Sequence, residues 1–182
     1  MAYIGDLDIL ARRKVALFCS VQCPGGLIIG AHDLAQALRR SEIAVVSGFQ
    51  SPVEQECLTI LLRGPVPLIL CPARSIGRMT IRPEWRAPIE SGRLLLLSIF
   101  AEHHRRPTAQ LAMERNRLVA AFADIVFVVH AAPSSKTVEF CREVRAVAKA
   151  MYTLDDPANT ELISFGAKAV MPMEAPLMFA SL

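Results

Sequence analysis

The stretch Met113-Glu-Arg-Asn-Arg-Leu-Val-Ala-Ala-Phe-Ala-Asp-Ile-Val-Phe-Val-Val129 decides the fold, because it joins a helical segment directly to a strand. Apolar side chains recur at helical spacing in its first part, and the last five residues form the continuous apolar run of a strand buried on both faces. We expect Arg115, Asn116 and Arg117 to lie at the start of this helix, where two guanidiniums and an amide are suited to phosphate. A nucleic acid or a nucleotide is therefore the first ligand class to test.

Outward from this stretch, short apolar runs alternate with amphipathic segments along the chain. The expected strands are residues 15–19, 43–46, 68–71, 94–97, 125–129 and 151–154. The expected helices are residues 31–40, 52–62, 83–91, 110–121, 136–148 and 160–165. This β-α-β order predicts an α/β fold, a three-layer sandwich with helices on both faces of a mostly parallel central sheet.

Length and composition favour one domain over residues 1–182, because 182 residues with 53% apolar content suffice for one substantial core. We expect the core at about residues 12–170. Residues 171–182 form an apolar C-terminal tail that is too short to be a domain, and we expect it to pack on the body or on a partner.

The sequence has no run of about 18 apolar residues and no signal-peptide order of charges followed by an apolar core. We therefore expect a cytoplasmic protein with no membrane contact. The five cysteines include no C-x-x-C pair and have no histidines at zinc-finger spacing, so we expect reduced, mostly buried thiols and neither a metal nor a cofactor.

The net charge of +3 is too small to indicate a nucleic acid by itself, but its distribution is uneven. Nine arginines and four glutamates lie between residues 74 and 117. Arginine predominates over lysine in the whole chain, and its planar fork matches phosphate oxygens and stacks on bases. The middle of the chain is therefore expected to carry the basic surface.

Small polar residues follow three of the expected strands, and the carboxyl ends of parallel strands meet at one edge of a sheet. Ser20 follows the first strand, Ser47-Gly48 ends the second, and residues 130–137, with Lys136, follow the fifth. The first loop lacks G-x-G-x-x-G order, and no acidic residue ends the second strand, which argues against a dinucleotide site. Phe49 and Trp85 are the aromatic residues that we expect to be free to stack on bases.

Five segments in order resemble the motif series of the DNA-processing protein A (DprA/Smf) family. They are Lys14-Val-Ala-Leu-Phe-Cys-Ser20, Val45-Val-Ser-Gly-Phe-Gln50, Leu95-Leu-Leu-Ser-Ile-Phe100, Arg115-Asn-Arg-Leu-Val-Ala-Ala121 and Asn159-Thr-Glu-Leu-Ile-Ser-Phe-Gly-Ala167. The resemblance implies a Rossmann-like sheet that binds single-stranded DNA without catalysing a reaction. It also implies a homodimer that helps to load a RecA-type recombinase during natural transformation.

The resemblance also implies a set of site residues. At or near the family's DNA pocket it places Ser20, Ser47, Gly48, Arg115, Asn116 and Arg117, and at the rim it places Lys136. Two motifs differ. The family's Gly-Ser-Arg is Cys19-Ser-Val21 here, and its Ser-Gly-Leu-Ala-x-Gly-Ile-Asp is Ser47-Gly-Phe-Gln-Ser-Pro-Val-Glu54, so one phosphate-binding arginine and one glycine are absent.

Other functions stay open. The chain also resembles the lysine-decarboxylase-like phosphoribohydrolases at residues 131–137, but Phe140 stands where their catalytic glutamate would be. Glu139 is one residue away, which rotates it by about 100° around a helix. A small-nucleotide sensor with the same pocket and a homodimerising structural protein with a degenerate pocket are the remaining alternatives.

Overall fold

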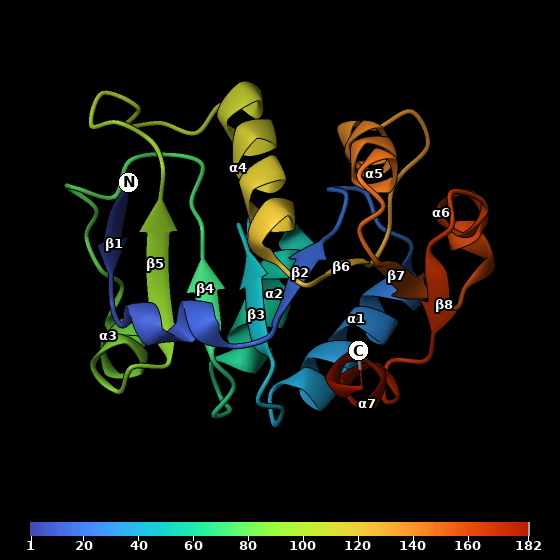
Figure 1. The fold of residues 1–182 in the computed structure, drawn as a ribbon, viewed down its shortest axis with the longest axis horizontal. Coiled ribbons are helices and arrows are strands. Elements are labelled where there is room, and N and C mark those ends of the chain that lie inside the picture. Colours follow the sequence, from blue (N-terminus) through green and yellow to red (C-terminus); the bar gives the residue numbers. More distant parts are fainter. Residues whose placement is uncertain (182) are drawn as a thin grey trace.

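The computed structural model describes residues 1–181, and its centre is an eight-stranded sheet (Figure 1). The strands lie in the order β1-β5-β4-β3-β2-β6-β7-β8. Their bounds are β1 Ala2–Ile4, β2 Lys14–Phe18, β3 Ala44–Ser47, β4 Leu68–Leu70, β5 Leu94–Ser98, β6 Ile125–Val128, β7 Met151–Leu154 and β8 Lys168–Val170. β1 pairs antiparallel with β5, and all the other pairs are parallel, which confirms the predicted α/β class.

The helices follow the strands in alternation. They are α1 Gly25–Leu38, α2 Pro52–Leu61, α3 Pro83–Glu90, α4 Ala109–Phe122, α5 Lys136–Ala146, α6 Thr160–Ser164 and α7 Ala175–Ala180, with two 3-10 turns, η1 Leu7–Ala11 and η2 Pro157–Asn159. None of the helices in residues 1–181 is long and apolar enough to cross a membrane. β1 and β8 were not predicted from the sequence, because each has three residues and is partly exposed at a sheet edge. α7 was not predicted either.

Two apolar layers cover the sheet, one on each face. The first unites side chains of α1, α2, α3 and α7, and the second unites those of α4, α5 and α6. Alternate residues of one strand supply both layers: Leu17 packs in the first and Phe18 in the second. Burial on both faces explains why the strands are continuous apolar runs.

The C-terminal segment packs on the body of the molecule through α7. The ring of Phe179 is fully buried and lies edge-on to Phe127 and Tyr152, with ring centroids 6.0 and 5.3 Å apart. Figure 1 shows α7 beside α1, near the C-terminus.

The start of α4 differs from the sequence expectation. Thr108 caps this helix, because its Oγ1 accepts a hydrogen bond of 3.2 Å from the backbone N–H of Leu111. α4 therefore begins at Ala109, and the expectation that Arg115 and Arg117 lie at the helix start is wrong. Both arginines lie beyond the first turn, where the attraction of a helix N-terminus for anions has faded.

The connections between the strands change direction at β2, and this change creates a crevice at the edge of the sheet. β2 lies between β3 and β6, and the helices that follow β2 and β6, α1 and α5, cover opposite faces. In open α/β sheets, ligands bind beyond the carboxyl ends of the strands at such a point.

Candidate nucleic-acid interface

A tight turn after β3 brings Gly48 against the side chain of Arg115 on α4. A Cβ at position 48 would overlap the Arg115 guanidinium, so a larger residue there would have to displace the end of this side chain. The buried Ser47 Oγ accepts a hydrogen bond of 3.0 Å from the backbone N–H of Phe49. Phe49 itself has a φ of 46°, in the left-handed region that non-glycine residues rarely adopt. This strained turn is held between β3 and α4.

Arg115 crosses the carboxyl edge of the sheet and is bound there by neutral acceptors. Its Nη1 donates to the carbonyl oxygen of Cys71 at 2.8 Å, its Nη2 to Oε1 of Gln50 at 3.1 Å, and its Nε to Oδ1 of Asn116 at 2.7 Å. The side chain is buried, and burial lowers the pKa of its guanidinium, against the opposing charge of Glu54. A guanidinium has five N–H donors, so two of them have no acceptor within residues 1–181.

Glu54, in the first turn of α2, ties the ends of β2 and β3 together. Its Oε1 accepts from the backbone N–H of Cys19 at 2.9 Å, and its Oε2 accepts from those of Gln50 at 2.7 Å and Ser51 at 3.2 Å. Burial raises the pKa of this carboxyl, while the charge of Arg115 opposes the shift. The sequence analysis did not name Glu54 as a site residue, although Ser51-x-x-Glu54 is a capping box.

Ser20 lies at the switch point and joins the loops that follow β2 and β6. Its Oγ accepts from the backbone N–H of Ala132 at 3.0 Å and lies 3.3 Å from Oγ of Ser135. Ser135 caps α5, and Lys136 is the exposed first residue of that helix. Ser20 and Lys136 are therefore brought to one corner.

Arg117 points away from Arg115, because two residues along a helix turn a side chain by about 200°. Its Nε and Nη2 each lie 2.7 Å from a carboxylate oxygen of Glu143 on α5. The structure thus groups Ser47, Gly48, Arg115 and Asn116 at one place and does not bring Arg117 to them.

The loops after β4 and β5 carry further arginines at the same edge, which is the upper edge in Figure 1. Arg74, Arg78 and Arg105 surround a hollow of about 120 Å³, and Glu102 is the acidic residue in its lining. The backbone N–H of Ser75 donates to the carbonyl oxygen of His104 at 2.8 Å, which joins the two loops. All three belong to the arginine excess that the sequence shows between residues 74 and 117, but they were not predicted as site residues.

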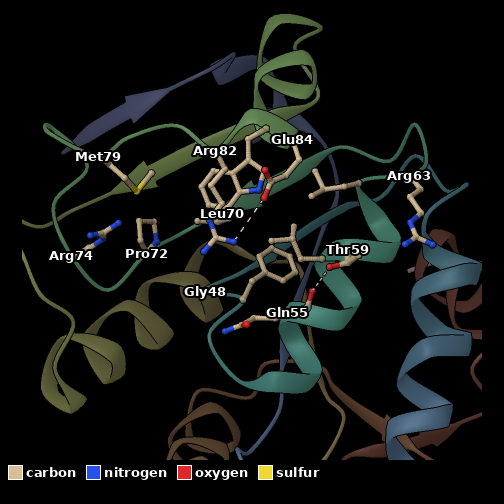
Figure 2. A pocket seen from close by; sticks show the side chains of 14 residues that line it. Gly48, Gln55, Thr59, Arg63, Leu70, Pro72, Arg74, Met79, Arg82 and Glu84 are labelled. Carbon is tan, nitrogen blue, oxygen red and sulfur yellow. Dashed lines mark hydrogen bonds and ion pairs between the residues drawn. The ribbon is translucent and has the colours of Figure 1, made fainter.

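A larger cavity of about 570 Å³ opens between α2 and α3 and reaches the edge at Gly48 (Figure 2). Phe49 and Trp85, the two aromatic residues expected to stack on bases, both line it, but they are only 5% and 6% exposed. Arg63, Arg74 and Arg82 also contribute to its lining.

In the phosphoribohydrolases a catalytic glutamate would lie at this edge. Phe140 is buried, and its ring packs edge-on against Phe18 with centroids 4.7 Å apart. Glu139 faces solvent on α5. Neither residue places a negative charge beside an arginine at the end of β6.

Fold and site together define a Rossmann-like α/β protein whose carboxyl edge is basic and rich in hydrogen-bond donors. The family model for DNA recombination-mediator protein A matches residues 1–180, so the chain belongs to that family. This confirms the resemblance found in the sequence motifs. No curated protein sequence matches the chain.

Solved structures of low sequence identity share the fold. DNA processing protein A (DprA) from Streptococcus pneumoniae has a TM-score of 0.79 at 20% identity, over 97% of this chain and 64% of that one. DNA processing protein A from Helicobacter pylori, whose structure is described for its single-stranded DNA binding mode, has a TM-score of 0.79 at 21% identity, over 98% and 86%. A molybdenum cofactor binding protein from Rippkaea orientalis has a TM-score of 0.66 at 13% identity, over 93% and 96%.

Proposed function

We propose that this protein binds single-stranded DNA through phosphate contacts along the carboxyl edge of its sheet. The observation that carries the proposal is the convergence of Arg74, Arg78 and Arg105 around one hollow with one acidic residue. Three guanidiniums facing one carboxylate leave an excess positive charge that favours an anion. Membership in the DNA recombination-mediator protein A family supports DNA as the source of that anion.

The residues expected from the motifs take different parts in this proposal. Arg115 has two N–H donors that are free of acceptors within residues 1–181, and Gly48 leaves room for the guanidinium to reach this edge of the sheet. Oδ1 of Asn116 orients the Arg115 guanidinium by accepting a hydrogen bond from its Nε, and Ser47 stabilises the turn after β3. Arg117 is not part of the proposed surface, because its Nε and Nη2 each donate to a carboxylate oxygen of Glu143.

The corner that holds Ser20 and Lys136 contributes one cation to the proposed surface. Lys136 is exposed at the start of α5, and Ser20 holds the loop before it through the backbone N–H of Ala132. We expect Lys136 to contact a phosphate, while Ser20 acts by fixing the loop.

Titration of fluorescein-labelled oligothymidylate by fluorescence anisotropy at several salt concentrations tests the proposal. Binding of about four phosphates predicts a slope of log affinity against log salt of roughly −3. The Arg74→Gln/Arg105→Gln variant should bind more weakly and lose about 1 to 1.5 of that slope, since two contacts are removed. Salt-independent binding or no binding by the unaltered protein would overturn the proposal.

Arg117→Gln is the matched control, because it removes an arginine of α4 that is engaged elsewhere. It should leave affinity and slope unchanged, whereas Arg115→Lys, which keeps the charge but loses the fork, should weaken binding. Equal losses in these two variants would contradict the assigned surface. Circular dichroism would show that each variant is folded.

The proposal extends to a role in DNA processing in the cytoplasm during natural transformation. We expect the protein to form a homodimer and to act with a RecA-type recombinase. Family membership supports these parts. Light scattering after size-exclusion chromatography measures the oligomeric state, and co-purification with a recombinase on single-stranded DNA measures the partnership. Release of free base from a nucleoside monophosphate would instead favour the hydrolase alternative.

A further inference from the structure

The cavity between α2 and α3 has the size of a small-molecule site. Its volume of about 570 Å³ lies within the range of about 300–1,000 Å³ that is typical of ligand pockets. Phe49, Leu58, Leu70, Met79 and Trp85 supply apolar and aromatic walls. Walls of this kind fit a flat apolar group such as a nucleobase, because every base offers a π-face for stacking.

Three arginines also line the cavity. Arg63 lies in the turn after α2, Arg74 in the loop after β4 and Arg82 at the N-cap of α3, and Glu84 is the acidic residue among them. In Figure 2, Arg63 and Arg74 lie on opposite sides of the view, and Arg82 lies between them, beside Glu84. The group that fits the cavity therefore combines a flat apolar part with a negative charge.

Trp85 has an unsatisfied polar group beside this space. The residue is only 6% exposed, and its indole N–H has no acceptor within residues 1–181. Burying a donor without an acceptor is unfavourable, so a ligand oxygen that reached the indole N–H would remove this cost. Nucleobases carry carbonyl oxygens that can accept such a bond.

The guanidinium of Arg82 covers the ring of Trp85. It lies 4.9 Å from the centre of the indole ring, and one of its nitrogens lies 3.9 Å from Glu84. Two-thirds of the Arg82 side chain is exposed, and the ion pair is long, so little holds the guanidinium in place. A phosphate at the arginine side would draw it off the ring and free the indole for a base.

We propose that this cavity binds one nucleotide unit, with its base against Phe49 and Trp85 and its phosphate between Arg74 and Arg82. The proposal goes beyond DNA binding along the edge, because it requires no strand at Arg115. The unit has two sources: a free nucleoside monophosphate, or one nucleotide of a strand that turns inward at Gly48, which lines the cavity and contacts Arg115.

The single tryptophan of the chain reports directly on this cavity. Titration with thymidine 5′-monophosphate should quench the Trp85 fluorescence to saturation. Thymidine should bind at least tenfold more weakly, because it lacks the phosphate, and inorganic phosphate should not quench by stacking. Absence of saturable quenching by both the monophosphate and oligothymidylate would overturn the proposal.

Arg82→Gln should weaken the binding of the monophosphate about tenfold, while Arg86→Gln should leave it unchanged. Arg86 is the matched control because it is an exposed arginine of the same helix that does not line the cavity. Calorimetry with Trp85→Phe, which keeps a ring but removes the N–H donor, should also show weaker binding. Affinity for the monophosphate that is unaltered in both variants, measured by quenching for Arg82→Gln and by calorimetry for Trp85→Phe, would refute the assignment.

Titrations with oligothymidylate and with the monophosphate distinguish the two sources of the nucleotide. They also distinguish a failure of this inference from a failure of the proposed function. If oligothymidylate quenches the tryptophan fluorescence at concentrations tenfold below those that the monophosphate needs, the bound unit is one nucleotide of a strand. Quenching by the monophosphate alone identifies a free nucleotide, which upholds the cavity and counts against the strand. Salt-dependent anisotropy with oligothymidylate but no tryptophan quenching by either ligand upholds DNA binding and overturns the cavity.

Discussion

The guanidinium of Arg115 occupies the space in which a side chain at position 48 would lie, so Gly48 and Arg115 act as one unit. The two residues lie 67 positions apart, on the turn after β3 and on α4. Their packing fixes the edge of the sheet that we propose as the DNA surface.

Gly48→Ala should destabilise the protein by about 1–3 kcal/mol, because the added methyl group must displace a well-packed guanidinium. Urea denaturation measures this loss. Gly25→Ala is the control, since a Cβ there meets no atom within 4 Å, and it should change the free energy of unfolding by less than about 0.5 kcal/mol.

The same pair can be tested by a double-mutant cycle. Gly48→Ala combined with Arg115→Ala should be less destabilising than the sum of the single changes, because the methyl group enters space that the guanidinium has left. Strict additivity would show that the two side-chain positions do not compete for this space.

Ser20→Ala should cost about 1–3 kcal/mol of stability, because the backbone N–H of Ala132 loses its acceptor at a mostly buried position. Ser164→Ala, at an exposed hydroxyl on α6, is the comparison. Thermal unfolding of both variants checks the difference, and equal melting temperatures would argue against a structural role for the Ser20 hydroxyl.

The Arg117–Glu143 pair should stabilise the protein in a way that depends on pH. The hydrogen bonds from Arg117 hold the pKa of Glu143 below its usual range. A lowered carboxyl pKa in the folded state gives stability that is present above the unfolded pKa and is lost as the pH falls through the folded value. The difference in melting temperature between the unaltered protein and Arg117→Gln should therefore disappear in acid, and also in high salt.

One thiol should react in the folded protein. Burial raises the pKa of Cys57, Cys71 and Cys141 to about 12 and also raises that of Cys19. Burial raises the pKa of Cys23 too, but this residue is partly exposed, whereas the other four are buried. A disulfide reagent at pH 8 should modify Cys23 first, and the other four only after unfolding. Native Cys23→Ser should show almost no reaction; rapid modification of that variant would show that another thiol is accessible.

The order and type of the central elements could be predicted from the sequence because they depend on local patterns. Val126, Phe127 and Val128 are apolar without interruption because both faces of β6 are covered. The buried residues Leu111, Arg115 and Val119 recur every four positions along α4, as helical spacing requires. The short edge strands β1 and β8 have no such pattern, since one side of each is open to solvent. Their pairing depends on partners far away in the chain.

The sequence by itself determined the α/β class, the family and the basic character of the middle of the chain, because periodicity, motif order and composition are properties of neighbouring residues. Only the tertiary structure decided that Arg115 turns to Gly48 while Arg117 turns to Glu143, and that Phe49 and Trp85 line one cavity. These relationships depend on helix rotation and on the packing of distant segments across the sheet, which no local pattern encodes.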